Sequence, residues 1–218
     1  MAALDVTIRD QRPDDADAVF AVVRAAFADD PAVAPLEADL GGRDDSVGFV
    51  AEADGRVVGH VRITRCWIDA EDALVEARVL SPLSVVPDAQ GRGVGGALVE
   101  RAVAAAEATG VPVVVLEGDP GYYARLGFGH AAELGLTPAS PRVPAAAFQA
   151  VRFPAYEGWM RGPIVYPETF WTHDAVGLRG DVLAEVRAAL GEQPPELVIT
   201  FPRGRSRGGP PLAKPVRE

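Results

Sequence analysis

The feature that most constrains the fold is a glycine-rich loop placed directly before a helical segment. Gly91, Gly93, Gly95 and Gly96 fall within six residues, and a helical pattern follows them. Glycines in such a run cost conformational entropy, and they leave backbone N–H groups bare at the start of a helix. Because bare amides at a helix N-terminus attract anions, the loop predicts a bound phosphate.

Three kinds of phosphate-binding loop compete for this segment. The Walker loop needs a Lys-Ser/Thr pair after its glycines, and none follows here. The dinucleotide pattern G-x-G-x-x-G does match, and Glu117 ends the next predicted strand at a suitable distance to bind a ribose. Two features count against it: Pro87–Gln90 separate the strand from the first glycine, and three β-rich segments precede the loop without crossover helices.

The rest of the chain predicts the order β-α-β-β-β-α-β, followed by a proline-rich part. Asp54–Gly55 lies between two β-rich runs and predicts a hairpin turn. Val111–Gly118 is almost continuously apolar, which is typical of a central strand covered on both faces. Other predicted elements are a strand at 4–9, a helix that follows with Pro13 in its first turn, a short helix within 29–45, a short helix ending at Gly127, strands at 148–153 and 163–166, and a helix at 181–190.

Two motifs resemble those of the GNAT family of acetyl-CoA-dependent N-acetyltransferases. The family's loop [QR]-x-x-G-x-[GA] is present as Gln90-Gly91-Arg92-Gly93-Val94-Gly95, after a strand and before a helix. The downstream pattern Tyr-x-x-x-Gly-Phe is present at Tyr123–Phe128. The resemblance covers roughly residues 4–135, and two motifs at this separation are more specific than either alone.

The resemblance implies an α/β (α+β) GNAT fold. Its central sheet is mixed, mostly antiparallel and twisted, with helices on both faces. A splay separates the strand before the glycine loop from the next strand. Pro82 fits the start of this splay, because proline cannot donate to a sheet ladder and marks a bulge or an unpaired edge.

The resemblance also implies acetyl-CoA as co-substrate and assigns residues to it. The pantetheine arm is expected along Leu83, Ser84 and Val85, whose N–H groups would polarise the thioester carbonyl. The pyrophosphate is expected on the loop residues, which are Gln90, Gly91, Arg92, Gly93, Val94, Gly95 and Gly96.

In the family, a tyrosine often returns a proton to the departing thiolate, and Tyr123 occupies that motif position. A phenol titrates near pH 10 and is protonated at neutral pH, so this role is chemically sound. The general base is open. The family's glutamate on the splayed strand corresponds to Val79, which leaves water, or else Glu52, Glu76 or His60. No metal site is predicted.

Charge and composition limit the partners. The formal net charge is −10, and residues 203–218 carry five basic side chains and one acidic, so the preceding residues are strongly acidic. Such an acidic protein surface argues against nucleic acid as partner and is compatible with a cationic substrate.

No apolar stretch is long enough for a membrane span, and no signal peptide is expected. The single cysteine, Cys66, is expected to be buried and fits a cytoplasmic location.

The expected organisation is a GNAT domain over 1–170, with core motifs at 4–135 and C-terminal strands at 146–167. An appendage with a helix follows over 171–202, and 203–218 form a disordered basic tail. The predicted function is transfer of an acetyl group from acetyl-CoA to an amine on a small molecule or a protein. The alternatives are a non-catalytic acyl-CoA-binding sensor or scaffold and, less favoured, a nicotinamide dinucleotide protein. A homodimer is compatible with the sequence.

Overall fold

A mixed sheet of nine strands organises the molecule, which the computed structural model describes over residues 4–192. The strand order is β1-β2-β3-β4-β5-β8-β6, while β9 pairs with β3 and with β7. Among the strands of the described residues, only β4–β5 and β7–β9 are parallel pairs. The strands are β1 (Thr7–Asp10), β2 (Ser46–Ala53), β3 (Arg56–Asp69), β4 (Leu74–Val85), β5 (Val113–Glu117), β6 (Gly129–His130), β7 (Leu136–Thr137), β8 (Phe148–Arg152) and β9 (Gly162–Val165).

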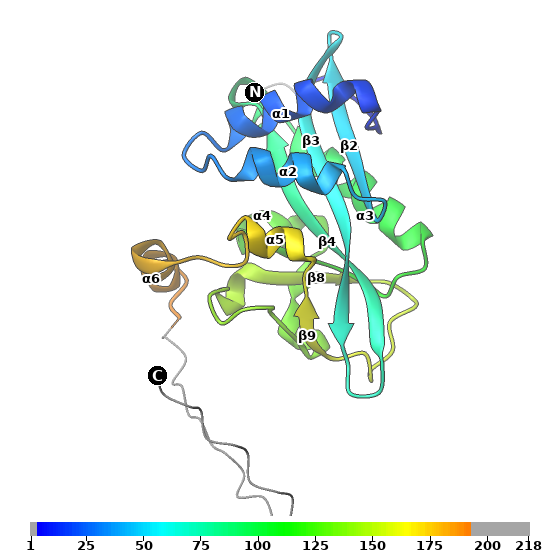
Figure 1. Ribbon diagram of the computed structural model, residues 1–218, viewed down its shortest axis with the longest axis vertical. Coiled ribbons are helices and arrows are strands. Elements are labelled where there is room, and N and C mark those ends of the chain that lie inside the picture. The colour runs from blue at the N-terminus through cyan, green and yellow to red at the C-terminus, as the bar shows by residue number, and fades with distance from the viewer. Residues whose placement is uncertain (1–3, 193–218) are drawn as a thin grey trace, which may run out of the picture.

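Helices cover both faces of this sheet, as Figure 1 shows: α1 and α2 lie on one face and α3 on the other. The mixed, mostly antiparallel sheet with helices on both faces confirms the predicted fold class. The helices are α1 (Ala16–Ala26), α2 (Val33–Gly41), α3 (Val94–Ala108), α4 (Pro120–Tyr123), α5 (Glu168–Thr172) and α6 (Gly180–Ala189).

The hairpin between β2 and β3 turns at Asp54 and Gly55, as predicted. Their φ angles are 50° and 73°, so both residues adopt the left-handed conformation. A two-residue turn with two positive φ angles matches the right-handed twist of the flanking strands. Aspartate and glycine are among the residues that tolerate this conformation best, which is why the local sequence specifies the turn.

The predicted splay lies between β4 and β5. These strands pair only at Arg78–Val114 and Val79–Val115. Beyond this point β4 continues along β3, whereas β5 continues along β8 as far as the Glu117–Phe148 pair. The two strands therefore diverge and leave the β5-facing edge of β4 without a neighbouring strand from Leu80 onward.

Pro82 lies at this divergence, in the bulge that its sequence position predicts. The β3–β4 register shifts between Val61, which faces Leu83, and Ile63, which faces Leu80. The bulge therefore contains Pro82, whose missing N–H would otherwise interrupt a regular ladder.

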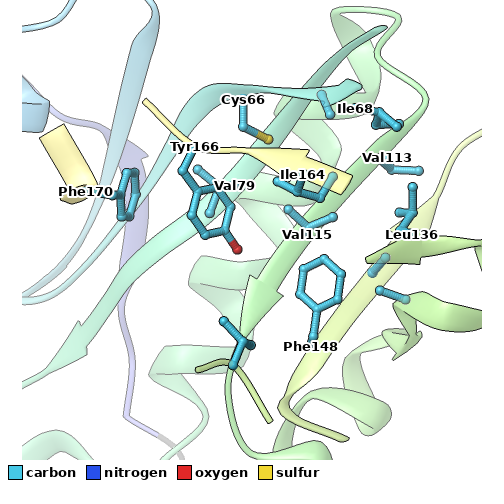
Figure 2. Packing of buried hydrophobic residues seen from close by; sticks show 14 of the residues in the cluster. Cys66, Ile68, Val79, Val113, Val115, Leu136, Phe148, Ile164, Tyr166 and Phe170 are labelled. Carbon is cyan, nitrogen blue, oxygen red and sulfur yellow. The ribbon is translucent and has the colours of Figure 1, made fainter. Parts of the chain in front are cut away.

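Two large apolar clusters and a smaller one, which joins α1 and α2 to β2 through Val19, Val23, Ala34 and Val50, form the core of the described residues. One large cluster packs α3 against β2, β3 and β5 and contains Leu98 and Phe128. The other large cluster, drawn in Figure 2, joins β3, β4 and β5 to β8, β9 and α5. Cys66 belongs to the second cluster and is fully buried, as predicted, and burial raises the pKa of its thiol.

The C-terminal part contributes α6 close to the predicted helix at 181–190. No helix within residues 4–192 combines the length and the apolar character needed to cross a bilayer. The predicted basic tail at 203–218 lies outside the described residues.

Candidate active site

A cleft of about 730 Å³ opens where β4 and β5 diverge. One wall is the segment of β4 from Val79 to Leu83, and another is the end of β5 with the turn that follows it. The remaining walls come from the α1–α2 connection, from Tyr166 and Phe170, and from α6. The splay therefore produces an accessible space, which a regularly paired sheet would have filled.

The glycine-rich loop leads into α3 with the backbone geometry of an anion site. Gly91 and Gly93 have φ angles of 68° and 90°, and nothing lies within 4 Å of a Cβ built on either. Glycine is needed here for its backbone conformation and not for space. Gly93 is the N-cap of α3, and no side chain caps this helix, so its first N–H groups are free of a side-chain partner.

Gln90 ties the loop to β4, because its side-chain amide Nε2 donates to the carbonyl of Val85 at 2.9 Å. Arg92 is partly buried, and its Nε makes no hydrogen bond to any described residue. The loop is thus fixed at the end of the very strand that borders the cleft.

Two adjacent tyrosines connect the loop to the cleft. A Cβ on Gly95 would stand 2.5 Å from the Tyr122 hydroxyl, so Tyr122 covers the start of α3. The rings of Tyr122 and Tyr123 meet edge to face with centroids 4.9 Å apart. Tyr123 lines the cleft and Tyr122 does not.

Tyr123 is held in a mostly apolar setting. Its ring also contacts Phe128 edge to face, at a centroid distance of 5.7 Å. Burial raises the pKa of Tyr123, so the phenol stays protonated at neutral pH. The geometry is compatible with proton donation from Tyr123, and this role stays a prediction.

The three residues expected along the pantetheine arm lie in the part of β4 beyond the splay. Leu83 lines the cleft. Ser84 is 1% exposed, and its Oγ has no hydrogen-bond partner among residues 4–192. Val85 points toward α3, where its Cγ2 would be 3.7 Å from a Cβ on Gly95.

The three side chains considered as general bases lie elsewhere. Glu52 pairs with Arg9, and Glu76 pairs with Arg78. His60 is a residue of β3 and is fully buried near Glu37, and burial lowers its pKa. None of the three lines the cleft, whereas Val79, which occupies the position of the family's glutamate, does.

Glu117 is a glutamate that does line the cleft, at the end of β5. Its Oε2 accepts a hydrogen bond from the N–H of Gly177 at 3.1 Å, while Oε1 is buried without a partner in the described part of the chain. Burial raises the pKa of Glu117. The sequence pattern marked it only as a possible ribose ligand, although an acid that ends a buried apolar strand is itself a signal of function.

Comparisons with known proteins agree with this geometry. A family model described as an acetyltransferase (GNAT) domain matches residues 7–131, more than half of the chain. The uncharacterized N-acetyltransferase YhbS of Escherichia coli K12 is 34% identical over 125 residues, which are 56% of this chain and 72% of YhbS. The uncharacterized N-acetyltransferase YjhQ of the same strain is 34% identical over 83 residues, but the match spans only 46% of its length.

Solved structures give the same result. The crystal structure of Escherichia coli YhbS in complex with CoA superimposes with a TM-score of 0.68 and 30% identity, covering 78% of this chain and 94% of YhbS. A GNAT acetyltransferase from Brucella melitensis in complex with acetyl-CoA gives a TM-score of 0.61 and 29% identity, covering 76% of this chain and 98% of that protein.

Proposed function

Because the chain belongs to the GNAT family of acetyl-CoA-dependent acyltransferases, we propose that it transfers the acetyl group of acetyl-CoA to an amine nitrogen by direct attack. The observation that carries this proposal is the divergence of β4 from β5 beside the uncapped start of α3. The divergence of the strands provides a space for the acyl chain, and the adjacent start of α3 provides a site for the pyrophosphate.

In this proposal, acetyl-CoA binds along β4 with its pyrophosphate on the glycine loop. The free N–H groups at the start of α3 and the positive end of the helix dipole favour the anion. The edge of β4 that β5 leaves unpaired offers backbone groups to the pantetheine from Leu83 to Val85. The two similar structures that hold CoA and acetyl-CoA support this choice of co-substrate.

The chemical step needs a neutral amine, a polarised carbonyl and a protonated leaving group. The amine nitrogen attacks the thioester carbon, and N–H groups of β4 stabilise the oxyanion that forms. When the C–S bond breaks, Tyr123 gives its phenolic proton to the thiolate. The raised pKa of Tyr123 keeps that proton available.

A single buried cysteine supports placing this reaction in a reducing cytoplasm.

A thiol-release assay with acetyl-CoA and a panel of primary amines tests the proposal. We expect release that depends on the amine, and a fall of about 10²-fold or more in kcat for Tyr123→Phe. Tyr122→Phe is the matched control for the chemical step: Tyr122 lies outside the cleft, so kcat should be retained, and because its hydroxyl covers the start of α3 any change should fall on KM for acetyl-CoA.

The competing function is an acyl-CoA-binding sensor or scaffold without turnover. Calorimetry and the thiol-release assay together decide between the two. A sensor binds acetyl-CoA in the calorimeter but releases no thiol with any amine, whereas a transferase does both. Equal thiol release by Tyr123→Phe and the unchanged protein would remove Tyr123 from the mechanism and leave the transferase assignment in place.

A further inference from the structure

The charged side chains that line the cleft are all carboxylates: Asp30, Glu117, Asp119 and Asp174. Asp174 is paired with Arg142 and Arg179. Asp30 and Asp119 each accept a hydrogen bond from a nearby backbone N–H. Among residues 4–192, the lining of the cleft includes no lysine, arginine or histidine. An acceptor with its own carboxylate or phosphate would therefore meet like charge, whereas an ammonium ion would be attracted.

The cleft walls are otherwise largely apolar. Phe27 and Leu36 come from the α1–α2 region, Tyr166 and Phe170 from the segment around α5, and Leu190 from the end of α6. The rings of Tyr166 and Phe170 lie next to one another with centroids 5.3 Å apart. Such walls favour an alkyl or aryl body, and ring faces also attract a cation.

Two buried polar atoms in this cleft lack a partner, which points to a ligand. Tyr166 is only 4% exposed, and neither its hydroxyl nor Glu117 Oε1 meets the geometry of a hydrogen bond within residues 4–192, although the two groups lie close enough for each to shift the pKa of the other. Figure 2 shows the Tyr166 hydroxyl pointing away from Cys66, on the side of the ring that faces the end of β5. Buried polar groups are normally satisfied, and an ammonium group has three N–H donors to offer.

The C-terminal segment holds Glu117 in place. Gly177 donates its N–H to Glu117, and its φ angle is 67°. A Cβ on Gly177 would stand 2.6 Å from the carbonyl carbon of Arg142, so the backbones are in close contact there. Leu178 N–H donates to the Arg142 carbonyl at 3.0 Å and fixes the segment. These residues lie beyond the 7–131 range that the family model matches, so this arrangement belongs to the chain's C-terminal part.

We propose that the acceptor is a primary amine with an apolar body and no acidic group, which binds as its ammonium ion to Glu117 and transfers its proton to that carboxylate. The hydroxyl of Tyr166 accepts a second N–H of the ammonium and orients it, and Gly177 positions Glu117. This inference rests on the proposed acetyl transfer and specifies its substrate class and its base.

The proton balance of the step is complete with these residues. The ammonium loses one proton to Glu117, and the neutral nitrogen forms the C–N bond. The C–S bond breaks, and the sulfur takes the proton of Tyr123. The new amide nitrogen loses its remaining extra proton to the Tyr123 phenolate, and Glu117 releases its proton to water. The net products are the N-acetyl amine, CoA and one proton.

Three acceptors of equal chain length test the substrate class: hexylamine, 6-amino-1-hexanol and 6-aminohexanoate. We expect kcat/KM to be highest for hexylamine, lower for the alcohol, and at least about 10²-fold lower for the carboxylate. Comparable values for hexylamine and 6-aminohexanoate would overturn the inferred class while leaving acetyl transfer intact.

Glu117→Gln tests the base, with Glu71→Gln as the control because Glu71 is exposed in the β3–β4 turn. We expect Glu117→Gln to lower kcat/KM for hexylamine by about 10²-fold or more, with acetyl-CoA affinity unchanged. Glu117→Asp should restore part of the loss. Unchanged kcat/KM in Glu117→Gln would overturn the role of Glu117.

A second measurement does not depend on turnover. Calorimetric titration of hexylamine into the CoA-loaded protein should show binding that weakens in Glu117→Gln and in Tyr166→Phe. If no amine releases thiol but this binding pattern appears, acetyl transfer is wrong and the ammonium site stands. If hexylamine does not bind, or binds equally to all variants, the ammonium site is wrong.

Discussion

The ring of Tyr123 packs against the bare Cα of Gly118, where a Cβ would stand 2.4 Å from ring atom Cε2. Gly118 is held at the end of β5, because its N–H donates to the Ala147 carbonyl at 2.9 Å. Phe128 contacts the same tyrosine ring edge to face. The absence of a side chain at Gly118 therefore decides where the Tyr123 hydroxyl points.

Gly118→Ala should displace this ring and impair the proposed proton transfer. A shift of about 1 Å in a catalytic group costs on the order of 10²-fold in rate, so we expect kcat to fall by about 10- to 100-fold. Affinity for acetyl-CoA should change little. Steady-state kinetics and calorimetry measure the two effects. Gly129→Ala is the control, since the nearest atom to its Cβ would be Glu133 Oε2 at 3.9 Å; equal kcat in both variants would contradict the prediction.

Gly93→Ala should weaken both the fold and acetyl-CoA binding. The φ angle of 90° at Gly93 is strained for any residue with a Cβ, at a cost of about 1–2 kcal/mol. Urea denaturation should show this loss, and calorimetry should show a higher Kd for acetyl-CoA. Gly42→Ala, with φ of −80° and ordinary contacts, should leave both unchanged. A loop that tolerates Gly93→Ala without loss of affinity would argue against the anion site.

The parts of the fold that were predictable are those with local causes. The turn at Asp54–Gly55, the bulge at Pro82 and the buried strand β5 each follow from backbone rules that act over a few residues. The glycine loop also has a local signature, and its resemblance to a family motif predicts the cofactor side of the site.

The proposed acceptor side was not predictable from local patterns, because contacts between residues far apart in the sequence bring its residues together. Glu117 is held by Gly177, which is 60 residues away in the sequence. Likewise, Arg62 of β3 is buried against Glu37 of α2, and no pattern in the sequence around either residue predicts this contact. A charged residue that would usually be exposed gains a structural or functional role when it is buried. Which charged residues are buried depends on the complete fold and cannot be predicted from neighbouring residues.

Glu117→Gln should make the protein more stable, and increasingly so as the pH rises. Burial raises the pKa of Glu117, while the Tyr166 hydroxyl, the Gly177 N–H and the charge of Arg142 oppose the shift, and Asp30, Asp119 and Asp174 also border the cleft. A carboxyl whose folded pKa is raised favours folding at low pH, and this contribution is lost as the pH increases through that pKa. Glutamine resembles the protonated form and does not pay the cost of a buried charge.

Thermal unfolding at pH 5 and pH 8 measures this effect. The gain in Tm of Glu117→Gln over the unchanged protein should be larger at pH 8. In the unchanged protein, the apparent pKa of the acid limb of the kcat/KM profile should lie above the usual range for a carboxyl group. In Glu117→Gln, the residual activity should show no such limb. A Tm difference that shrinks with rising pH would show that Glu117 is stabilised as a carboxylate.

The ion pair between Glu37 and Arg62 should be the most sensitive charged contact in the fold. Arg62 Nε donates to Glu37 Oε2 at 2.8 Å, and both side chains are only 3% exposed. Arg62→Met leaves a buried carboxylate without its partner, so we expect a loss of about 3–5 kcal/mol in the free energy of unfolding. Arg65→Met is the matched control on the same strand, because Arg65 is 40% exposed, and it should cost less than about 1 kcal/mol.

The double variant Glu37→Leu/Arg62→Met separates the value of the pair from the cost of breaking it. With both charges removed, neither side chain leaves an unpaired buried charge, so the loss should be well below the sum of the two single losses. Urea denaturation of the four proteins gives this coupling directly. Additive losses would mean that each side chain stabilises the fold through its own packing with α2 and β3, and that the charge pair itself contributes nothing.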